Sequence, residues 1–127
     1  MGATVNFTAT AATARRAFEA AGELTILCAG REGGFALEDA YAAGRFVEAI
    51  VPGKERRTLE VNDAVVAARE LVKKFGDDWK KAVRASAHAR FLKECGFGDD
   101  VAFAAEQDAR AVVPGYADHR ITVSGRG

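Results

Sequence analysis

The stretch "LTILCAGREGGFALEDAYAAG", residues 24–44, decides the expected fold. Its first five residues are continuously apolar and rich in strand formers, as in a parallel strand that is covered on both faces. Three glycines follow, and then Glu38 and Asp39 open a stretch with apolar residues at spacings of three and four, which is typical of a helix. A strand, a glycine loop and a helix in this order predict a unit of an α/β fold.

Further helices are expected around this unit. Helix formers or one apolar face at helical spacing mark three segments: 9–22, 37–51 and 61–75. Gly22, Pro52-Gly53 and Gly76 are placed to end these helices. Beyond them the apolar stripe changes phase at Ser86, which predicts two short helices that meet there.

Short strands are expected elsewhere, in four segments: 3–7, 100–105, 112–113 and 120–123. In the second of these, Val101 and Phe103 lie on one side of an alternating pattern. A chain of 127 residues is large enough to bury one core without disulfides or metals. We therefore predict one α/β domain over residues 1–127, a layered sheet with mostly parallel strands and helices packed on it.

Composition disfavours several classes of function. The 18 basic and 18 acidic residues cancel, which disfavours nucleic acid or an anionic membrane as a partner. No apolar run approaches the roughly 20 residues that span a bilayer, and no export signal opens the chain, so a cytoplasmic protein is expected. Cys28 and Cys95 lie far apart without a C-x-x-C pattern, which predicts reduced, buried thiols rather than a zinc site or disulfide.

The glycine loop is a candidate phosphate site. In open α/β sheets, ligands bind beyond the carboxyl ends of the strands, often against a following helix N-terminus. Gly30, Gly33 and Gly34 would let backbone approach a phosphate, with Arg31 as a charge partner. The spacing matches neither of the common nucleotide-binding glycine motifs, so a simple tight turn stays open as the alternative.

Three further places carry candidate chemistry. Glu38 and Asp39 are hard oxygen ligands suited to Mg²⁺, or they complement the dipole of the helix that they begin. Adjacent helical residues point about 100° apart, so one of the two is expected to ligate. Ser86 and His88 are either a nucleophile and a base, or an N-cap serine with a histidine in the first helical turn. Asp108 is less easily explained by turn chemistry than the other acids near it.

Four stretches occur in an order seen in one known family: "VNFTATAAT", "ILCAGREGGFALEDAYAAG", "SAHARFLKECGFGDDVAFAAEQD" and "VVPGYADHRITV". Over nearly its whole length the chain resembles the 2-phosphosulfolactate phosphatase family (ComB-like). The most specific part is C-A-G followed by a Leu-Glu-Asp helix start. Family members are considerably longer, and the resemblance covers only their C-terminal half. Ala36 stands where many relatives have a serine before that helix.

The resemblance implies a Mg²⁺-dependent phosphatase that acts on a small acidic phosphate ester such as 2-phospho-3-sulfolactate, on the route to coenzyme M. It implies His88 and Asp108 as catalytic residues and Glu38 and Asp39 as metal ligands. It also implies six substrate contacts: Asn6, Gly30, Arg31, Gly33, Gly34 and Ser86. The alternative is a truncated, non-enzymatic relative that acts as a dimerising or partner-binding domain, for example as a homodimer.

Overall fold

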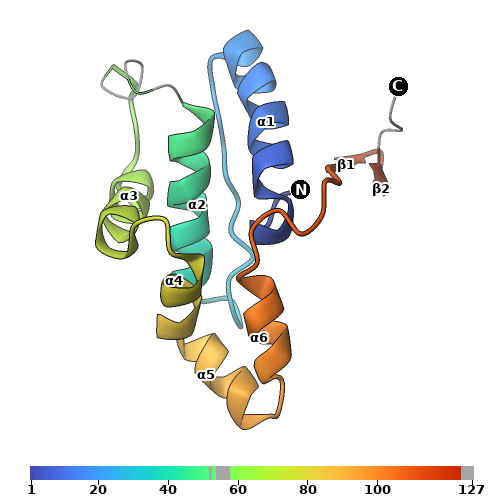
Figure 1. Cartoon of the computed structure of the whole chain (residues 1–127). Coiled ribbons are helices and arrows are strands. Elements are labelled where there is room, and N and C mark those ends of the chain that lie inside the picture. The colour runs from blue at the N-terminus through green and yellow to red at the C-terminus, as the bar shows by residue number, and fades with distance from the viewer. Residues whose placement is uncertain (52, 54–57, 124–127) are drawn as a thin grey trace.

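The computed structural model of the chain describes residues 1–51, 53 and 58–123. In chain order its elements are η1 (Thr4–Asn6), α1 (Phe7–Ala21), α2 (Leu37–Ile50), α3 (Asp63–Phe75), α4 (Trp79–Ala85), α5 (Ala87–Glu94), α6 (Gly98–Ala104), β1 (Pro114–Ala117) and β2 (Arg120–Val123). Helices α1 and α2 lie side by side, and the β1–β2 hairpin stands apart from the helices (Figure 1). No helix in this described part is long and apolar enough to cross a bilayer.

Side-chain caps set the starts of three helices. Asn62, Asp78 and Ser86 each accept a hydrogen bond from the backbone amide three residues further on, at 3.0 Å. The two short helices α4 and α5 thus meet at Ser86, and the predicted N-cap role of this serine is confirmed. Helix α2 ends at Ile50, close to the expected end, whereas Pro52 lies outside the described residues.

Tyr41 lies at the centre of the core and is 0% exposed. Its ring meets the rings of Phe75 and Trp79 edge-on, with centroids 5.8 and 5.1 Å away. Its hydroxyl donates to the Gly76 carbonyl at 2.8 Å and accepts from Arg45 at 2.9 Å. The buried Arg45 guanidinium also lies over the Trp79 ring, 5.0 Å from its centroid. These contacts fix α3 and α4 against α2.

Helices α2 and α3 approach each other closely at Gly44. A Cβ atom built on Gly44 would lie 2.3 Å from the carbonyl oxygen of Ala68 and 2.8 Å from a methyl carbon of Val72. Real Cβ atoms do not come so close to backbone, so only glycine fits this position. The missing side chain therefore sets the distance between the two helices.

Residues 24–28, expected as a central strand, are extended but pair with no other described residue. The segment runs back between α1 and α2 (Figure 1). Leu24 and Ile26 pack against the core, whereas Thr25 is exposed and Leu27 is 94% exposed. This alternation is that of a strand. A strand in a sheet also needs neighbouring backbone groups that are free to form hydrogen bonds. The helices beside residues 24–28 use their own amides and carbonyls for hydrogen bonds within the helix.

Two other expected strands are helical, which corrects the prediction. Residues 3–7 form η1 and the first residue of α1, because Asn6 turns the chain and accepts a hydrogen bond from the amide three residues earlier at 2.7 Å. Residues 100–105 fall largely in α6. Asp99 and Asp100 occupy its first turn, where acids complement the helix dipole.

The C-terminal hairpin contains the one confirmed strand prediction. Strand β2 coincides with the expected residues 120–123 and pairs antiparallel with β1. Residues 112–113 lie just before β1 and are not in a strand. The protein thus combines helices with a small sheet, and a layered, mostly parallel sheet is not shown by the described residues.

Both cysteines are unpaired and exposed, so the expectation of buried thiols was wrong. Cys28 ends the extended segment that no strand covers, and Cys95 follows the last residue of α5. The apolar residues that precede Cys28 therefore did not lead to its burial.

Candidate functional site

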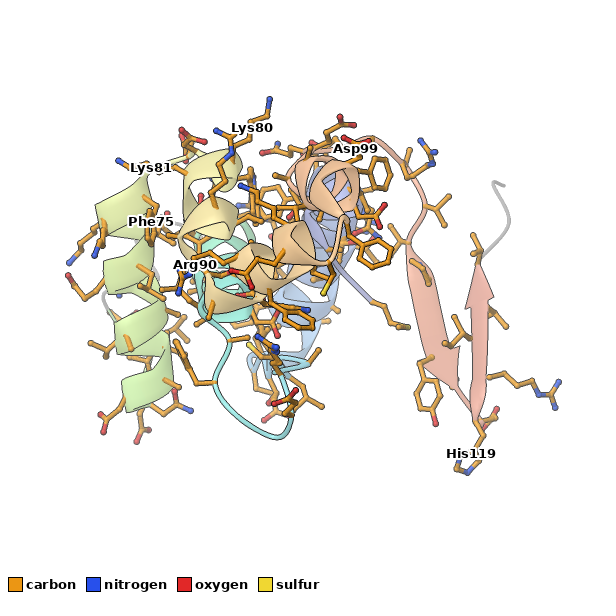
Figure 2. The ribbon with its side chains drawn as sticks, turned by 90° about the horizontal axis from the view of Figure 1, so that it is seen from below. Phe75, Lys80, Lys81, Arg90, Asp99 and His119 are labelled. Atoms are coloured by element: carbon orange, nitrogen blue, oxygen red, sulfur yellow. The ribbon has the colours of Figure 1, made fainter. Side chains whose placement is uncertain are left out.

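One cavity brings together predicted site residues from distant parts of the chain. It has a volume of about 310 Å³ and lies where the glycine loop, the start of α2 and the start of α5 meet. Figure 2 shows Arg90 on α5, well away from His119 at the tip of the hairpin. The charged and polar side chains that line the cavity are Arg31, Glu38, Ser86, His88 and Arg90.

Glu38 and His88 form the central contact of this cavity, across 50 residues of sequence. The carboxylate Oε1 lies 3.3 Å from the imidazole Nδ1, and the two side chains are 20% and 41% exposed. The contact orients the ring and occupies Nδ1, which leaves Nε2 for proton exchange with a ligand. A half-buried carboxylate that holds an imidazole is a common arrangement for acid–base chemistry.

The glycine loop is closed by its own backbone. The amide and carbonyl of Arg31 bond to the carbonyl and amide of Gly34 at 3.2 and 2.8 Å. Gly30 has a left-handed φ of 70°, and a Cβ atom there would lie 2.7 Å from the Gly34 oxygen, so a side chain does not fit. The amides of Gly30, Arg31 and Gly34 are thus engaged, whereas no described residue accepts from those of Glu32 and Gly33. The three glycines do not line the cavity that contains Glu38.

Asp39 holds this loop against the start of α2. Its Oδ2 accepts a hydrogen bond from the Gly30 amide at 2.7 Å, and the residue does not line the cavity. Cys28 is exposed, but its sulfur is partly desolvated, and this desolvation and then the negative charge of Asp39 raise the pKa of the thiol above its usual value. Cys28 is therefore poorly suited to act as a nucleophile.

The side chains near this cavity fit a metal ion that binds to only one or two protein ligands. Among the residues that the structure describes, no group of three or more His, Cys, Asp or Glu side chains is placed to hold a metal. Glu38 offers its carboxylate to the cavity, whereas Asp39 is engaged by the loop. Mg²⁺ is commonly bound through one or two carboxylates, water and substrate phosphate. Glu38 therefore fits such an ion, and a closed site made of protein ligands alone does not.

Arg90 lines the cavity and was missed by sequence reasoning. Its Nη1 donates to the Ala85 carbonyl at 3.0 Å, while the Arg31 guanidinium lies over the Phe91 ring, 4.7 Å from its centroid. A usable signal existed in the sequence. His88 and Arg90 both fall near the start of α5, where the helix dipole disfavours cations, so two basic residues there suggest a role other than helix stability.

Asn6 and Asp108 lie elsewhere and tie the N-terminus to the segment before the hairpin. The Asn6 amide donates to the Val112 carbonyl at 2.8 Å. The two carboxylate oxygens of Asp108 accept from the amide and the hydroxyl of Thr8 at 2.7 and 2.6 Å. Asp108 thus caps α1, which its own N-cap residue does not do. Neither residue lines the cavity that contains Glu38.

The carboxyl of Asp108 has a pKa below its ordinary value. Burial raises this pKa, but the hydrogen bonds from Thr8 and Gln107 lower it by more. A carboxyl whose pKa falls on folding stabilises the protein above its unfolded pKa of about 3.9. That contribution is lost as the pH falls through the lower, folded value.

Asp108→Asn is expected to lower the free energy of unfolding by about 1 kcal/mol at neutral pH, because the cap loses its charge. The difference from the unsubstituted protein should shrink below about pH 4. Asn tolerates the left-handed φ of 59° at this position, so backbone strain does not contribute. Urea unfolding across a pH series measures the effect. Asp118→Asn, at a φ of 49° in the hairpin turn, is the control, and an equal loss there would contradict the assignment.

Comparison with known proteins assigns this chain to a family. The family described as 2-phosphosulpholactate phosphatase matches residues 1–119, and the chain belongs to that family. A 2-phosphosulfolactate phosphatase of Methanothermobacter thermautotrophicus is 36% identical over 110 residues, which are 87% of this chain and 45% of that protein. A probable 2-phosphosulfolactate phosphatase of Deinococcus radiodurans is 33% identical over 81% of this chain and 42% of its own length. The chain thus spans less than half the length of these relatives.

Proposed function

We propose that the chain serves as a Mg²⁺-dependent phosphoric monoester hydrolase for a small acidic phosphate ester such as 2-phospho-3-sulfolactate. The observation that carries the proposal is the Glu38–His88 contact in a cavity that two arginines also line. The family of the chain and the names of its relatives support the same reaction class.

Arg31 and Arg90 bind the anionic groups of the substrate. A guanidinium presents paired N–H donors that match the oxygens of a phosphoryl, carboxylate or sulfonate group. Two such side chains in one cavity of about 310 Å³ suit a small ester with more than one anionic group.

Glu38 would hold Mg²⁺ through its carboxylate, since this ion commonly binds proteins through one or two carboxylates. When bound, Mg²⁺ neutralises charge on the phosphoryl oxygens. Asp39 positions the loop through the Gly30 amide, and Ser86, which is 2% exposed, positions His88 by capping α5. Asn6 and Asp108 support the fold at the start of α1.

His88 gives a proton to the leaving group. Water attacks phosphorus in line with the ester oxygen, the bond between phosphorus and that oxygen breaks, and the departing alkoxide takes the proton from His88. Both hydrogens of the attacking water stay on the inorganic phosphate, which leaves as dihydrogen phosphate, and His88 regains its proton from solvent water before the next turnover. Glu38 keeps the imidazole oriented during this transfer, through the contact at Nδ1.

Phosphate release from 2-phospho-3-sulfolactate, with Mg²⁺ and with a chelator, tests the proposal. We expect release that depends on Mg²⁺ and falls about 100-fold or more in Glu38→Gln, since charge stabilisation of this kind contributes roughly 10² to 10³ in rate. Glu70→Gln, an exposed acid on α3, is the control and should keep full activity. No release by the chain overturns the reaction, and a larger loss in Asp39→Asn than in Glu38→Gln overturns the choice of ligand.

A further inference from the structure

The extended segment 24–28 has the side-chain pattern of a strand and none of its pairing. Its backbone makes no hydrogen bond to the backbone of any other described residue. Leu24 and Ile26 are packed against the core, so the segment is held in place from one side. On the other side Leu27 is 94% exposed. A fixed apolar strand with free backbone groups is a ready template for another strand.

The surface beside residues 24–28 is also apolar and exposed. A groove of about 740 Å³ runs between this segment, the glycine loop and the faces of α2 and α3. Small residues line its helical wall, among them Ala40, Ala43 and Ala68, so a backbone could lie close to the helices there. Phe35, at the loop end of the groove, is 76% exposed. Exposed apolar surface of this kind marks an interaction site.

We infer that residues 24–28 form a strand of a larger sheet, completed by polypeptide equivalent to the part of the relatives that this chain does not match. The occupant contributes a strand that pairs with the free backbone of 24–28 and places apolar side chains over Leu27 and in the groove. The chain covers 45% of the Methanothermobacter relative, so that protein has ample further sequence to do this. The inference concerns a surface, does not depend on the reaction proposed above, and holds whether the occupant is joined to this chain or separate.

The main alternative occupant is a second copy of the chain, which the same edge could accept antiparallel. The remainder of the family protein is the favoured occupant because it is long enough to provide several elements. A second copy of this chain would add only its own residues 24–28 to the sheet. The exposed apolar side chains of the β1–β2 hairpin also favour the remainder of the family protein as the occupant. Two strands alone are marginally stable in water, and its Tyr116 and Ile121 are 65% and 61% exposed, so it too has an uncovered apolar surface.

Co-expression of this chain with the unmatched part of the Methanothermobacter relative tests the inference, with amide hydrogen exchange as the readout. We expect a one-to-one complex in which alternate amides of 24–28, those on the paired edge, become protected. Leu27→Lys should weaken it about 10- to 100-fold, which corresponds to burial of one leucine. Val66→Lys, on a helix residue that is 50% exposed, is the matched control and should leave binding unchanged.

Two results would overturn the inference. One is the absence of a complex, or a complex in which the amides of 24–28 still exchange freely. The other is a homodimer of this chain with those amides protected, which would make a second copy the occupant. Because Leu27 lies outside the Glu38 cavity, these measurements stand apart from the phosphate-release assay.

Discussion

Gly44→Ala is expected to destabilise the protein by about 2 kcal/mol. The new methyl group would lie 2.3 Å from the Ala68 carbonyl oxygen, so α2 and α3 must separate to admit it. Overpacking of this kind costs roughly 1 to 3 kcal/mol, and contact with backbone places it near the upper end. The higher helix propensity of alanine offsets about 1 kcal/mol of this cost, and the remainder is the expected loss of stability. Urea unfolding, followed by circular dichroism, measures it.

The control for this prediction is Gly98→Ala. Gly98 is the first residue of α6, and a Cβ atom there would meet nothing within 4 Å. Both variants add the same methyl group to a helical glycine, but only one adds it to a packed interface. We expect Gly98→Ala to be neutral or slightly stabilising. Equal stability of the two variants would show that α2 and α3 lie further apart at Gly44 than in the structure.

The longer helices were predictable from this sequence, whereas of the strands only β2 was. The apolar face of 37–51 and that of 61–75 correspond to α2 and α3, because helices form from local hydrogen bonds that the sequence specifies within one turn. A strand depends on a partner that can lie anywhere in the chain or outside it. Residues 24–28 have strand alternation without a partner, and residues 100–105 alternate over too few positions to exclude a helix.

The structure brings some of the predicted site residues into one cavity, but the sequence did not indicate which of them would meet. Resemblance to the family named both Glu38 and His88, yet only folding shows that they touch across 50 residues. The same geometry separates Asp108 from them, since its partners are in α1. Arg45 is buried against Tyr41 and Trp79, which a sequence pattern that places arginines on the surface does not foresee. Cytoplasmic location, a homodimer and exclusion of nucleic acid stay predictions.

His88→Gln is expected to slow hydrolysis of an alkyl phosphate ester by about 10²- to 10⁴-fold, the usual contribution of a general acid. An alkoxide is a poor leaving group unless it is protonated as the bond to phosphorus breaks. A nitrophenolate leaves without a proton, so the same variant should lose far less activity on 4-nitrophenyl phosphate. Initial rates on the two esters therefore separate proton donation by His88 from a loss of binding or of folding.

His119→Gln is the matched control, because this histidine lies at the tip of the hairpin, away from α5 (Figure 2), and should leave both rates unchanged. Glu38→Gln supplies a further comparison. If Glu38 acts both through Mg²⁺ and on the ring at 3.3 Å, its loss should reduce both rates, since charge on the phosphoryl oxygens must be stabilised for either leaving group. If His88→Gln slows hydrolysis of both esters equally, His88 does not act as the general acid and is a binding residue instead.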